Sequence, residues 1–123
     1  MPIEIVTKQT PNSATIKLYG SLDTATSPEL EQKLAPILAT PIHDLIFDLA
    51  ELKFISSAGL RVFATARKQL RERGGQASFV NMQPQIKEVF EIMKSLPGVQ
   101  IFKDVAELDQ YLAARQRSHQ ENA

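Results

Sequence analysis

The stretch that decides the fold runs from residue 47 to residue 60 and reads FDLAELKFISSAGL. It overlaps Leu45–Leu49, an almost unbroken apolar run without polar alternation. Such a run is typical of a strand that is buried on both faces of a sheet. A connecting segment then leads to Ser56-Ser57, where we predict that a helix begins.

This helix is expected to bury one apolar stripe and to end at a pair of glycines. The stripe consists of residues at helical spacing, namely Leu60, Phe63, Ala66 and Leu70. Gly74-Gly75 ends the pattern, and Ala77–Val80 indicates another strand. Strand, helix and strand in this order predict a right-handed βαβ unit with parallel strands.

The rest of the chain adds strands before this unit and helices after it. Ile3–Thr7 and Ala14–Tyr19 are short β-rich runs that we expect to form an antiparallel hairpin. Further helices are predicted to begin near Thr26, Pro84 and Asp104, and Ile101-Phe102 is a possible short edge strand. The order predicts an α/β (α+β) fold, a mixed sheet of four to five strands with about four helices packed against it.

Length and composition predict one cytoplasmic domain and exclude several classes of protein. The chain has 123 residues, 14 basic and 14 acidic, so it lacks the basic excess of a nucleic-acid binder. It has no cysteine, no signal-peptide pattern, no membrane-spanning apolar run and no phosphate-binding glycine loop. We predict a single domain over residues 1–114, a flexible polar tail over 115–123, no cofactor, and no nucleic-acid or membrane partner.

Catalytic and metal-binding interpretations receive little support from the sequence. A Ser-His-Asp site would need His43 and Asp48 to converge on a serine, although a loop histidine beside an aspartate is usually a surface residue. Asp23, Asp44 and Asp48 could form a Mg²⁺ site only if the fold brought them together. We expect neither a catalytic residue nor a metal ligand set.

Ser56-Ser57-Ala58-Gly59 is a chemically distinctive helix start. Small residues leave the start open, and its free N–H groups favour an anion. Two interpretations stay open: a serine merely caps the helix, or a serine carries a phosphate there.

The same helix is strongly basic, with five cations and one acid, Glu72. The cations are Arg61, Arg67, Lys68, Arg71 and Arg73. They form either a solvated outer face or a positive surface for an acidic partner. Val62 falls away from the apolar stripe, so we expect it to face outward.

Five stretches resemble the STAS domain family, in particular its anti-sigma factor antagonist branch, in register from about Ile3 to Leu112. They are Gly20-Ser21-Leu22-Asp23, similar to the family's G-x-L-D; the buried strand Leu45–Leu49; Phe54–Leu60, similar to an apolar pair followed by D-S-[SA]-G-L; the break at Gly74-Gly75; and Pro84–Met93, similar to P-x-[IV]-x-x-[VLF]-[FL]. The resemblance implies a STAS-like fold.

The resemblance also implies a phosphorylation-controlled, partner-switching role in transcription regulation and signal transduction. Ser57 matches the serine phosphorylated by a kinase of the GHKL-type ATPase fold that doubles as an anti-sigma factor. The unphosphorylated protein binds this kinase, and the phosphorylated protein is released until a PP2C-type phosphatase restores it. The chain would then be a phosphoprotein and a binder, not an enzyme. The partner-binding residues implied are Asp23, Ser56, Ser57, Ala58, Gly59, Arg61 and Val62.

One departure from the family pattern affects the phosphoacceptor. The family commonly has Asp immediately before the phosphorylated serine, and here that residue is Ser56. Ser57 remains the predicted site because it stands directly before the small residue and Gly59-Leu60, with Ser56 as the alternative. The departure suggests a divergent kinase or a lost phosphorylation. The alternative function is a non-switching STAS scaffold or interaction module in a signalling or transport assembly.

Overall fold

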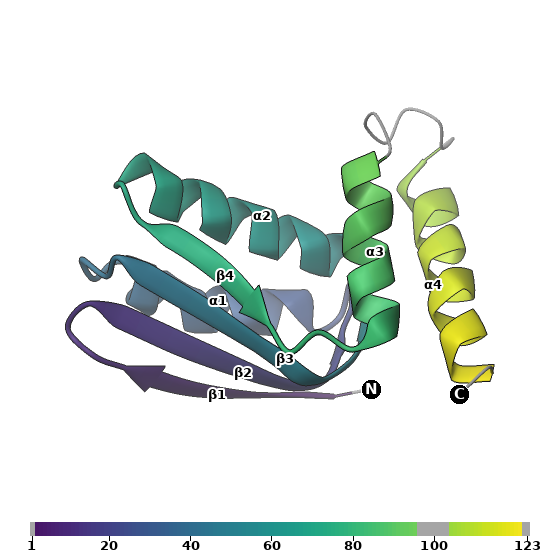
Figure 1. Cartoon of the computed structure of the whole chain (residues 1–123), viewed down its shortest axis with the longest axis horizontal. Helices are drawn as coiled ribbons and strands as arrows, with labels where there is room; N and C mark the ends of the chain where they lie inside the picture. The colour runs from purple at the N-terminus through teal and green to yellow at the C-terminus, as the bar shows by residue number, and fades with distance from the viewer. Residues whose placement is uncertain (1, 96–103, 122–123) are drawn as a thin grey trace.

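The computed structural model describes residues 2–95 and 104–121, which form a mixed sheet with helices packed against it (Figure 1). In chain order the elements are β1 (Ile3–Gln9), β2 (Ser13–Leu22), α1 (Ser27–Leu38), β3 (Asp44–Ile55), α2 (Ser57–Glu72), β4 (Gln76–Val80), α3 (Pro84–Ser95) and α4 (Val105–Glu121). The sheet order is β1-β2-β3-β4, with β1 and β2 antiparallel and the other two pairs parallel. The predicted hairpin, βαβ unit and fold class are confirmed.

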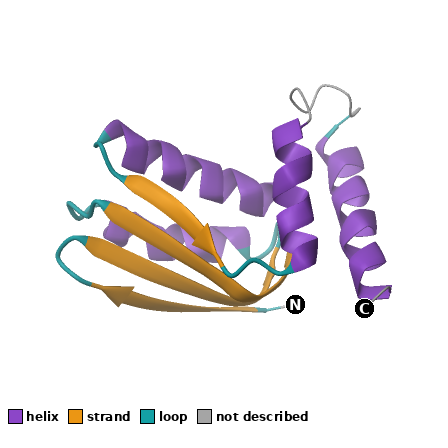
Figure 2. Cartoon of the chain, viewed as in Figure 1, coloured by secondary structure: helices purple, strands orange, loops and turns teal. Residues whose placement is uncertain are grey.

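The hydrophobic core lies between the sheet and the helices α1 and α2. Figure 2 shows these two helices running along one face of the sheet, while α3 and α4 stand at the end where β3 finishes. Phe47 of β3 is fully buried, and its ring centroid lies 4.7 Å from that of Phe63 on α2 and 5.2 Å from that of Phe79 on β4. This cluster fixes α2 over the centre of the sheet.

Strand β3 is buried on one face, so the prediction of a strand buried on both faces is wrong. Leu45, Phe47 and Leu49 are fully buried under the helices, whereas the intervening Ile46 and Asp48 are only half-buried. The physical reason is that α1 and α2 lie on the same side of the sheet (Figure 2). Ile46 interrupts the polar alternation that would otherwise have revealed the exposed face.

Strand β3 also continues to Ile55, beyond the end predicted at Leu49. It stays paired with β2 up to the Leu22–Ile55 pair, but the register shifts twice, between Lys17 and Tyr19 and between Gly20 and Ser21. Each shift changes which face the following side chains point to, as a β-bulge does. The alternation of the sequence is therefore broken where the strand itself continues.

Within the described residues, no strand pairs with the second half of β3 on its β4 side. The β3–β4 pairing ends at Asp48 and Val80. Three glutamine side chains bond the backbone beyond that point. Gln83 Nε2 donates to the Ala50 carbonyl at 2.7 Å, Gln85 Nε2 donates to the Lys53 carbonyl at 3.3 Å, and Gln116 bonds both the N–H and the carbonyl of Ile55. Side chains thus satisfy polar groups that a further strand would otherwise pair.

Two predictions about side chains and the C-terminus are wrong. Val62 is 6% exposed rather than outward-facing, because α1 packs beside α2 and widens its buried stripe. Residues 115–121 are not a flexible tail, because α4 continues to Glu121 and buries Gln116 to 2% exposure. The predicted strand at Ile101-Phe102 lies outside the described residues.

Candidate functional site

Ser56 and Ser57 join the end of β3 to the start of α2. Ser56 occupies the N-cap position with an extended backbone, φ −103° and ψ 176°. Its N–H donates to the Leu22 carbonyl at 2.9 Å, and its carbonyl accepts the Leu60 N–H at 3.0 Å. Backbone bonds therefore hold Ser56 at this junction, and the Ser56 hydroxyl makes no capping bond.

The hydroxyls of both serines are buried. Among the described residues, none forms a hydrogen bond with the Ser56 or Ser57 Oγ atoms. Ser56 is 5% exposed as a whole residue, whereas Ser57 is half-buried. Two buried hydroxyls without partners are costly by about 1–3 kcal/mol each. Such groups are rare in folded proteins.

Gly59 brings α2 close to the ends of β2 and β3. A Cβ added at this residue would lie 2.8 Å from Leu22 and 2.9 Å from Ile55 side-chain atoms. The close approach is made by side chains rather than by another backbone. Glycine at this position lets the first turn of α2 sit against the fully buried Leu22 and Ile55.

Asp23 lies beside the serines because β2 and β3 end together. Leu22 and Ile55 are register partners, so the residues that follow them emerge side by side. One carboxylate oxygen of Asp23 accepts the N–H groups of Ala25 and Thr26, each at 3.0 Å, and the Thr26 hydroxyl at 3.1 Å. Asp23 thus builds the turn into α1, and it stays only half-buried.

Two functional-site contacts come from α4 and were not predicted from the sequence. The Ser57 N–H donates to Asp109 Oδ1 at 2.9 Å. Gln116 Oε1 accepts the Ile55 N–H at 2.9 Å, and its Nε2 donates to the Ile55 carbonyl at 2.8 Å. No local motif marks these residues. The one available signal is that Asp109, Leu112 and Gln116 recur at helical spacing.

An ion pair attaches α4 to α3 next to these contacts. The Arg115 guanidinium donates to Glu88 Oε1 through Nε, at 2.9 Å, and through Nη2. This hydrogen bond and the charge of Glu88 raise the pKa of Arg115 above its ordinary value. The pair is half-exposed on the arginine side, so water screens it.

The basic surface of α2 opens onto a hollow beside Ser57. The hollow has a volume of about 1030 Å³ and is bounded by α2, β4, α3 and α4. Its charged lining residues are the cations Arg61, Arg67, Lys87 and Lys94 and the acids Glu91 and Asp104, around an apolar floor that includes Phe63 and Phe90. Arg73 does not belong to this surface, because its guanidinium donates to the Leu38 and Thr40 carbonyls at 2.6 and 2.7 Å.

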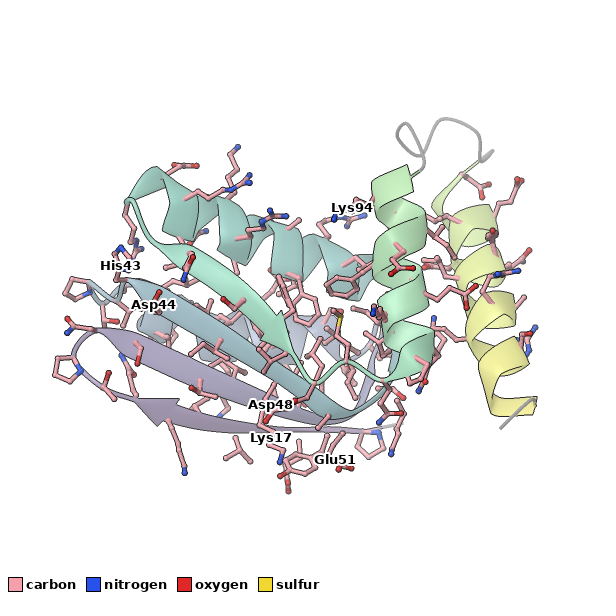
Figure 3. The ribbon with its side chains drawn as sticks, viewed as in Figure 1. Lys17, His43, Asp44, Asp48, Glu51 and Lys94 are labelled. Carbon is pink, nitrogen blue, oxygen red and sulfur yellow. The ribbon has the colours of Figure 1, made fainter. Side chains whose placement is uncertain are left out.

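The structure keeps the alternative catalytic and metal-binding residues apart. His43 and Asp44 lie 3.5 Å from one another at the beginning of β3, the end of the sheet away from α3 and α4 (Figure 3). Ser57 follows the other end of this twelve-residue strand. Asp23 lies at that far end too, so Asp23 and Asp44 cannot share a metal ion. Asp48 faces the open side, near Lys17 (Figure 3).

Within residues 2–95 and 104–121, no three His, Cys, Asp or Glu residues gather as a metal site. In the same part of the chain, no helix combines the length and the apolar character needed to cross a membrane. On the open face, a hydrogen bond with Tyr19 and then the charges of Asp48 and Glu51 raise the pKa of Lys17. Lys17 and these three partners lie on strands β2 and β3 and not at Ser57.

Comparison with known proteins identifies the family. The model of the STAS domain matches residues 4–108. The protein BtrV of Bordetella bronchiseptica is 39% identical over 75 residues, which cover 61% of this chain and 65% of BtrV, slightly under two thirds of that protein. The anti-sigma-B factor antagonist of Bacillus subtilis is 30% identical over 92 residues, which cover 75% of this chain and 84% of that protein.

The fold is also that of solved anti-sigma factor antagonists. The unphosphorylated form of the antagonist SpoIIAA has a TM-score of 0.63 at 20% identity, over 72% of this chain and 83% of SpoIIAA. The phosphorylated form, described as a Bacillus cell fate determinant, has a TM-score of 0.61 at 20% identity, over 72% and 82% of the two chains.

Proposed function

Because the chain belongs to the STAS domain family, we propose that it is an anti-sigma factor antagonist switched by phosphorylation of Ser57. In the unphosphorylated state it binds an anti-sigma factor that is also a serine kinase of the GHKL-type ATPase fold. Phosphorylation ends this complex, and a PP2C-type phosphatase restores binding. The protein acts in the cytoplasm as a substrate and a binder, and it supplies no catalytic residue of its own.

The observation that carries this proposal is the position of Ser57. It is the first residue of α2, it follows the end of β3, and the neighbouring strand β2 ends at Leu22, directly before Asp23. In open sheets with parallel strands, ligands and partners bind outside the carboxyl ends of such strands. The likeness to SpoIIAA, which has an unphosphorylated and a phosphorylated form, supports phosphorylation as the switch.

The switch is a local change of charge at a protein interface. The kinase transfers the γ-phosphoryl group of ATP to Ser57 Oγ, ADP leaves, and the hydroxyl proton is lost. The product adds about −1.5 to −2 charges at neutral pH. This dianion must be desolvated when a partner docks, and a penalty of about 3 kcal/mol weakens binding by about two decades.

The basic side of α2 supports an acidic partner surface. Arg61 is exposed next to Ala58 and Ser57, and the hollow beside it carries three further cations. Complementary charge speeds association and selects partners more than it raises affinity. Of the predicted partner-binding residues, Asp23, Ala58 and Arg61 are at least partly exposed, as is Ser57 apart from its buried hydroxyl. Ser56, Gly59 and Val62 are buried beneath this surface.

The test is phosphorylation by a purified anti-sigma serine kinase from the same organism, with the phosphate located by tandem mass spectrometry. Ser57→Ala is expected to abolish incorporation, and the matched variant Ser56→Ala is expected to retain it. Ser57→Asp should weaken kinase binding by about a hundredfold, and Ser57→Ala should preserve it. Equal kinase affinity of Ser57→Asp and Ser57→Ala contradicts the switch.

The buried hydroxyl of Ser57 favours one second candidate, a non-switching scaffold. A hydroxyl that is buried in the ground state must become accessible before a kinase can use it. The presence of Ser56 instead of the family's usual Asp points the same way. A stable partner complex that ignores substitution of both serines identifies a scaffold.

A further inference from the structure

Helix α4 lies against the start of α2 and bonds the backbone on both sides of Ser56. Asp109 accepts the Ser57 N–H, and Gln116 bonds the N–H and carbonyl of Ile55. Gln116 is 2% exposed, so these bonds are made away from water. Both side chains follow residue 108, where the match to the family ends. These contacts therefore come from a part of α4 that lies beyond the residues matched by the family.

We propose that α4 is a removable cover over Ser57, which competes with protein partners for the start of α2 and is expelled when Ser57 carries a phosphate. The competition and the expulsion rest on the proposed function, because they need a partner and a phosphate at Ser57. The covering itself rests on the contacts of α4 alone.

The contacts explain why a partner and α4 exclude one another. The Ser57 hydroxyl is buried and its N–H is already bonded to a carboxylate. A partner that binds the Ser57 N–H must first displace Asp109. Because displacement opposes binding, weakening α4 raises the apparent affinity of the partner. The surface thus fits a partner that can present an acidic side chain in place of Asp109.

The charge of Asp109 explains why a phosphate would expel the helix. The first N–H groups of α2 attract anions, and Asp109 fills this role in the unmodified chain. A phosphate on Ser57 brings about −1.5 to −2 charges beside the same N–H. Two anions then compete for one donor and repel one another, so α4 loses its polar attachment to α2.

Apart from these polar contacts, α4 is attached by the half-exposed Arg115–Glu88 pair to α3 and by its buried apolar side chains. Its buried apolar side chains at the described positions are Leu108 and Leu112. In contrast, α2 buries Gly59, Val62, Phe63, Ala66 and Leu70 against the sheet and α1. Figure 1 shows α4 on the outside of α3, at the edge of the molecule. A helix at the edge with few buried contacts is the element that opens first.

Thiol labelling measures the cover directly, because the chain has no cysteine of its own. A Ser57→Cys variant is reacted with an aromatic disulfide reagent, alone and combined with Gln116→Ala. Since Gln116→Ala changes no charge, it alters access to the thiol rather than its ionisation. We expect labelling about tenfold faster in the double variant, which corresponds to a small shift in the opening equilibrium.

Two matched controls define this experiment. Gln110→Ala changes an exposed glutamine of the same helix and should leave the labelling rate of the Ser57→Cys variant unchanged. Thr65→Cys presents an exposed thiol on α2 and should react at one rate with and without Gln116→Ala. If the Ser57→Cys variant with Gln116 intact is labelled as rapidly as the Thr65→Cys variant, the cover is overturned.

Amide hydrogen exchange provides a second measurement that needs no cysteine. If α4 opens as a unit, Asp109→Asn accelerates exchange of the Ile55 N–H, although Ile55 bonds Gln116 and not Asp109. Gln116→Ala likewise accelerates exchange of the Ser57 N–H. The Phe47 amide, in the β4-paired part of β3, should not respond. If each substitution accelerates exchange at only the amide that its own side chain contacts, the proposal that α4 opens as a unit is wrong.

The phosphate step is tested by the same amides. Ser57→Asp should accelerate exchange at Ile55 by about tenfold, and Asp109→Asn in the same chain should reduce this acceleration. If Ser57→Asp does not accelerate exchange at Ile55, the proposal that a phosphate expels α4 is wrong. If no kinase modifies Ser57 but the labelling results hold, the proposed function fails while the cover stands.

Discussion

The two halves of strand β3 are built in different ways. From Asp44 to Asp48 the strand is hydrogen-bonded to β2 on one side and to β4 on the other. From Leu49 to Ile55 it keeps β2, and glutamine side chains from α3 and α4 and from the segment before α3 bond the opposite edge at Ala50, Lys53 and Ile55. The doubly paired half holds the fold, and the other half carries the candidate site.

This difference matters because a side chain can leave a backbone group more readily than a whole strand can. A ladder of backbone bonds opens cooperatively, whereas one glutamine needs only a rotamer change or the movement of its helix. The end of β3 that leads into Ser57 is therefore the part of the sheet whose edge depends on side chains from α3, α4 and the segment before α3. The following substitutions test this contrast.

The largest expected effect comes from Phe47→Ala, in the doubly paired half. Phe47 is fully buried, and its ring contacts those of Phe63 and Phe79. Removing it should cost about 3–5 kcal/mol in the free energy of unfolding. Urea denaturation measures the loss. Phe54→Ala, the matched change in the other half, should cost clearly less because Phe54 is only half-buried. An equal loss of unfolding free energy in the two variants would contradict the difference between the two halves of β3.

Gly59→Ala should have the next largest effect, because it presses on the ends of β2 and β3. The new methyl group would lie 2.8 Å from Leu22 and 2.9 Å from Ile55. Overpacking of this kind costs about 1–3 kcal/mol and should also accelerate amide exchange at Ile55. Gly74→Ala provides the comparison, since Gly74 has φ +79° and no atom near the added Cβ. Its strain should lower stability without changing exchange at Ile55.

Gln83→Ala should loosen the second half of β3 with a small loss of global stability. It removes the donor to the Ala50 carbonyl at 2.7 Å, a contact worth about 0.5–1.5 kcal/mol. We expect faster exchange after residue 48 and unchanged exchange at Phe47, measured by nuclear magnetic resonance. Gln69→Ala, on the exposed side of α2, serves as control. Uniform acceleration along β3 would show that the two halves are one unit.

Arg115→Ala should have the smallest effect. Its pair with Glu88 is half-exposed, and exposed pairs contribute about 0.2–1 kcal/mol. Because salt screens such pairs, the difference in the midpoint of thermal unfolding between Arg115→Ala and the parent should shrink as NaCl is raised. Lys53→Ala is a control for a pair on the open face, where Lys53 lies 3.8 Å from Glu51. A difference that is large and insensitive to salt would assign Arg115 a structural role.

The doubly paired half of β3 could be predicted from the sequence, and the other half could not. Leu45–Leu49 is apolar enough to be recognised as a strand by composition alone. Beyond it, the register shifts opposite Ala50 and Lys53 break the period of two, so local alternation no longer reports the strand. Gln83, Gln85 and Gln116 look like ordinary polar helix residues, because their backbone partners lie 32 to 61 positions away.

The candidate site, like strand β3, could be predicted from the sequence only in part. Ser57, Asp23 and Gly59 could be named because they lie in stretches that resemble motifs of the STAS domain family. Val62 could not be oriented, because its burial depends on the neighbouring helix α1. Asp109 could not be predicted either, because its bond to Ser57 joins residues 52 positions apart. Local patterns predict elements, and contacts between distant elements require the fold.

The most direct test of the switch at Ser57 is a phosphosite map of the protein recovered from its own organism during growth and under stress. The proposed switch predicts phosphate on Ser57, in a proportion that changes with conditions. Phosphate confined to Ser56, or a Ser57 that remains unmodified under every condition, would contradict it.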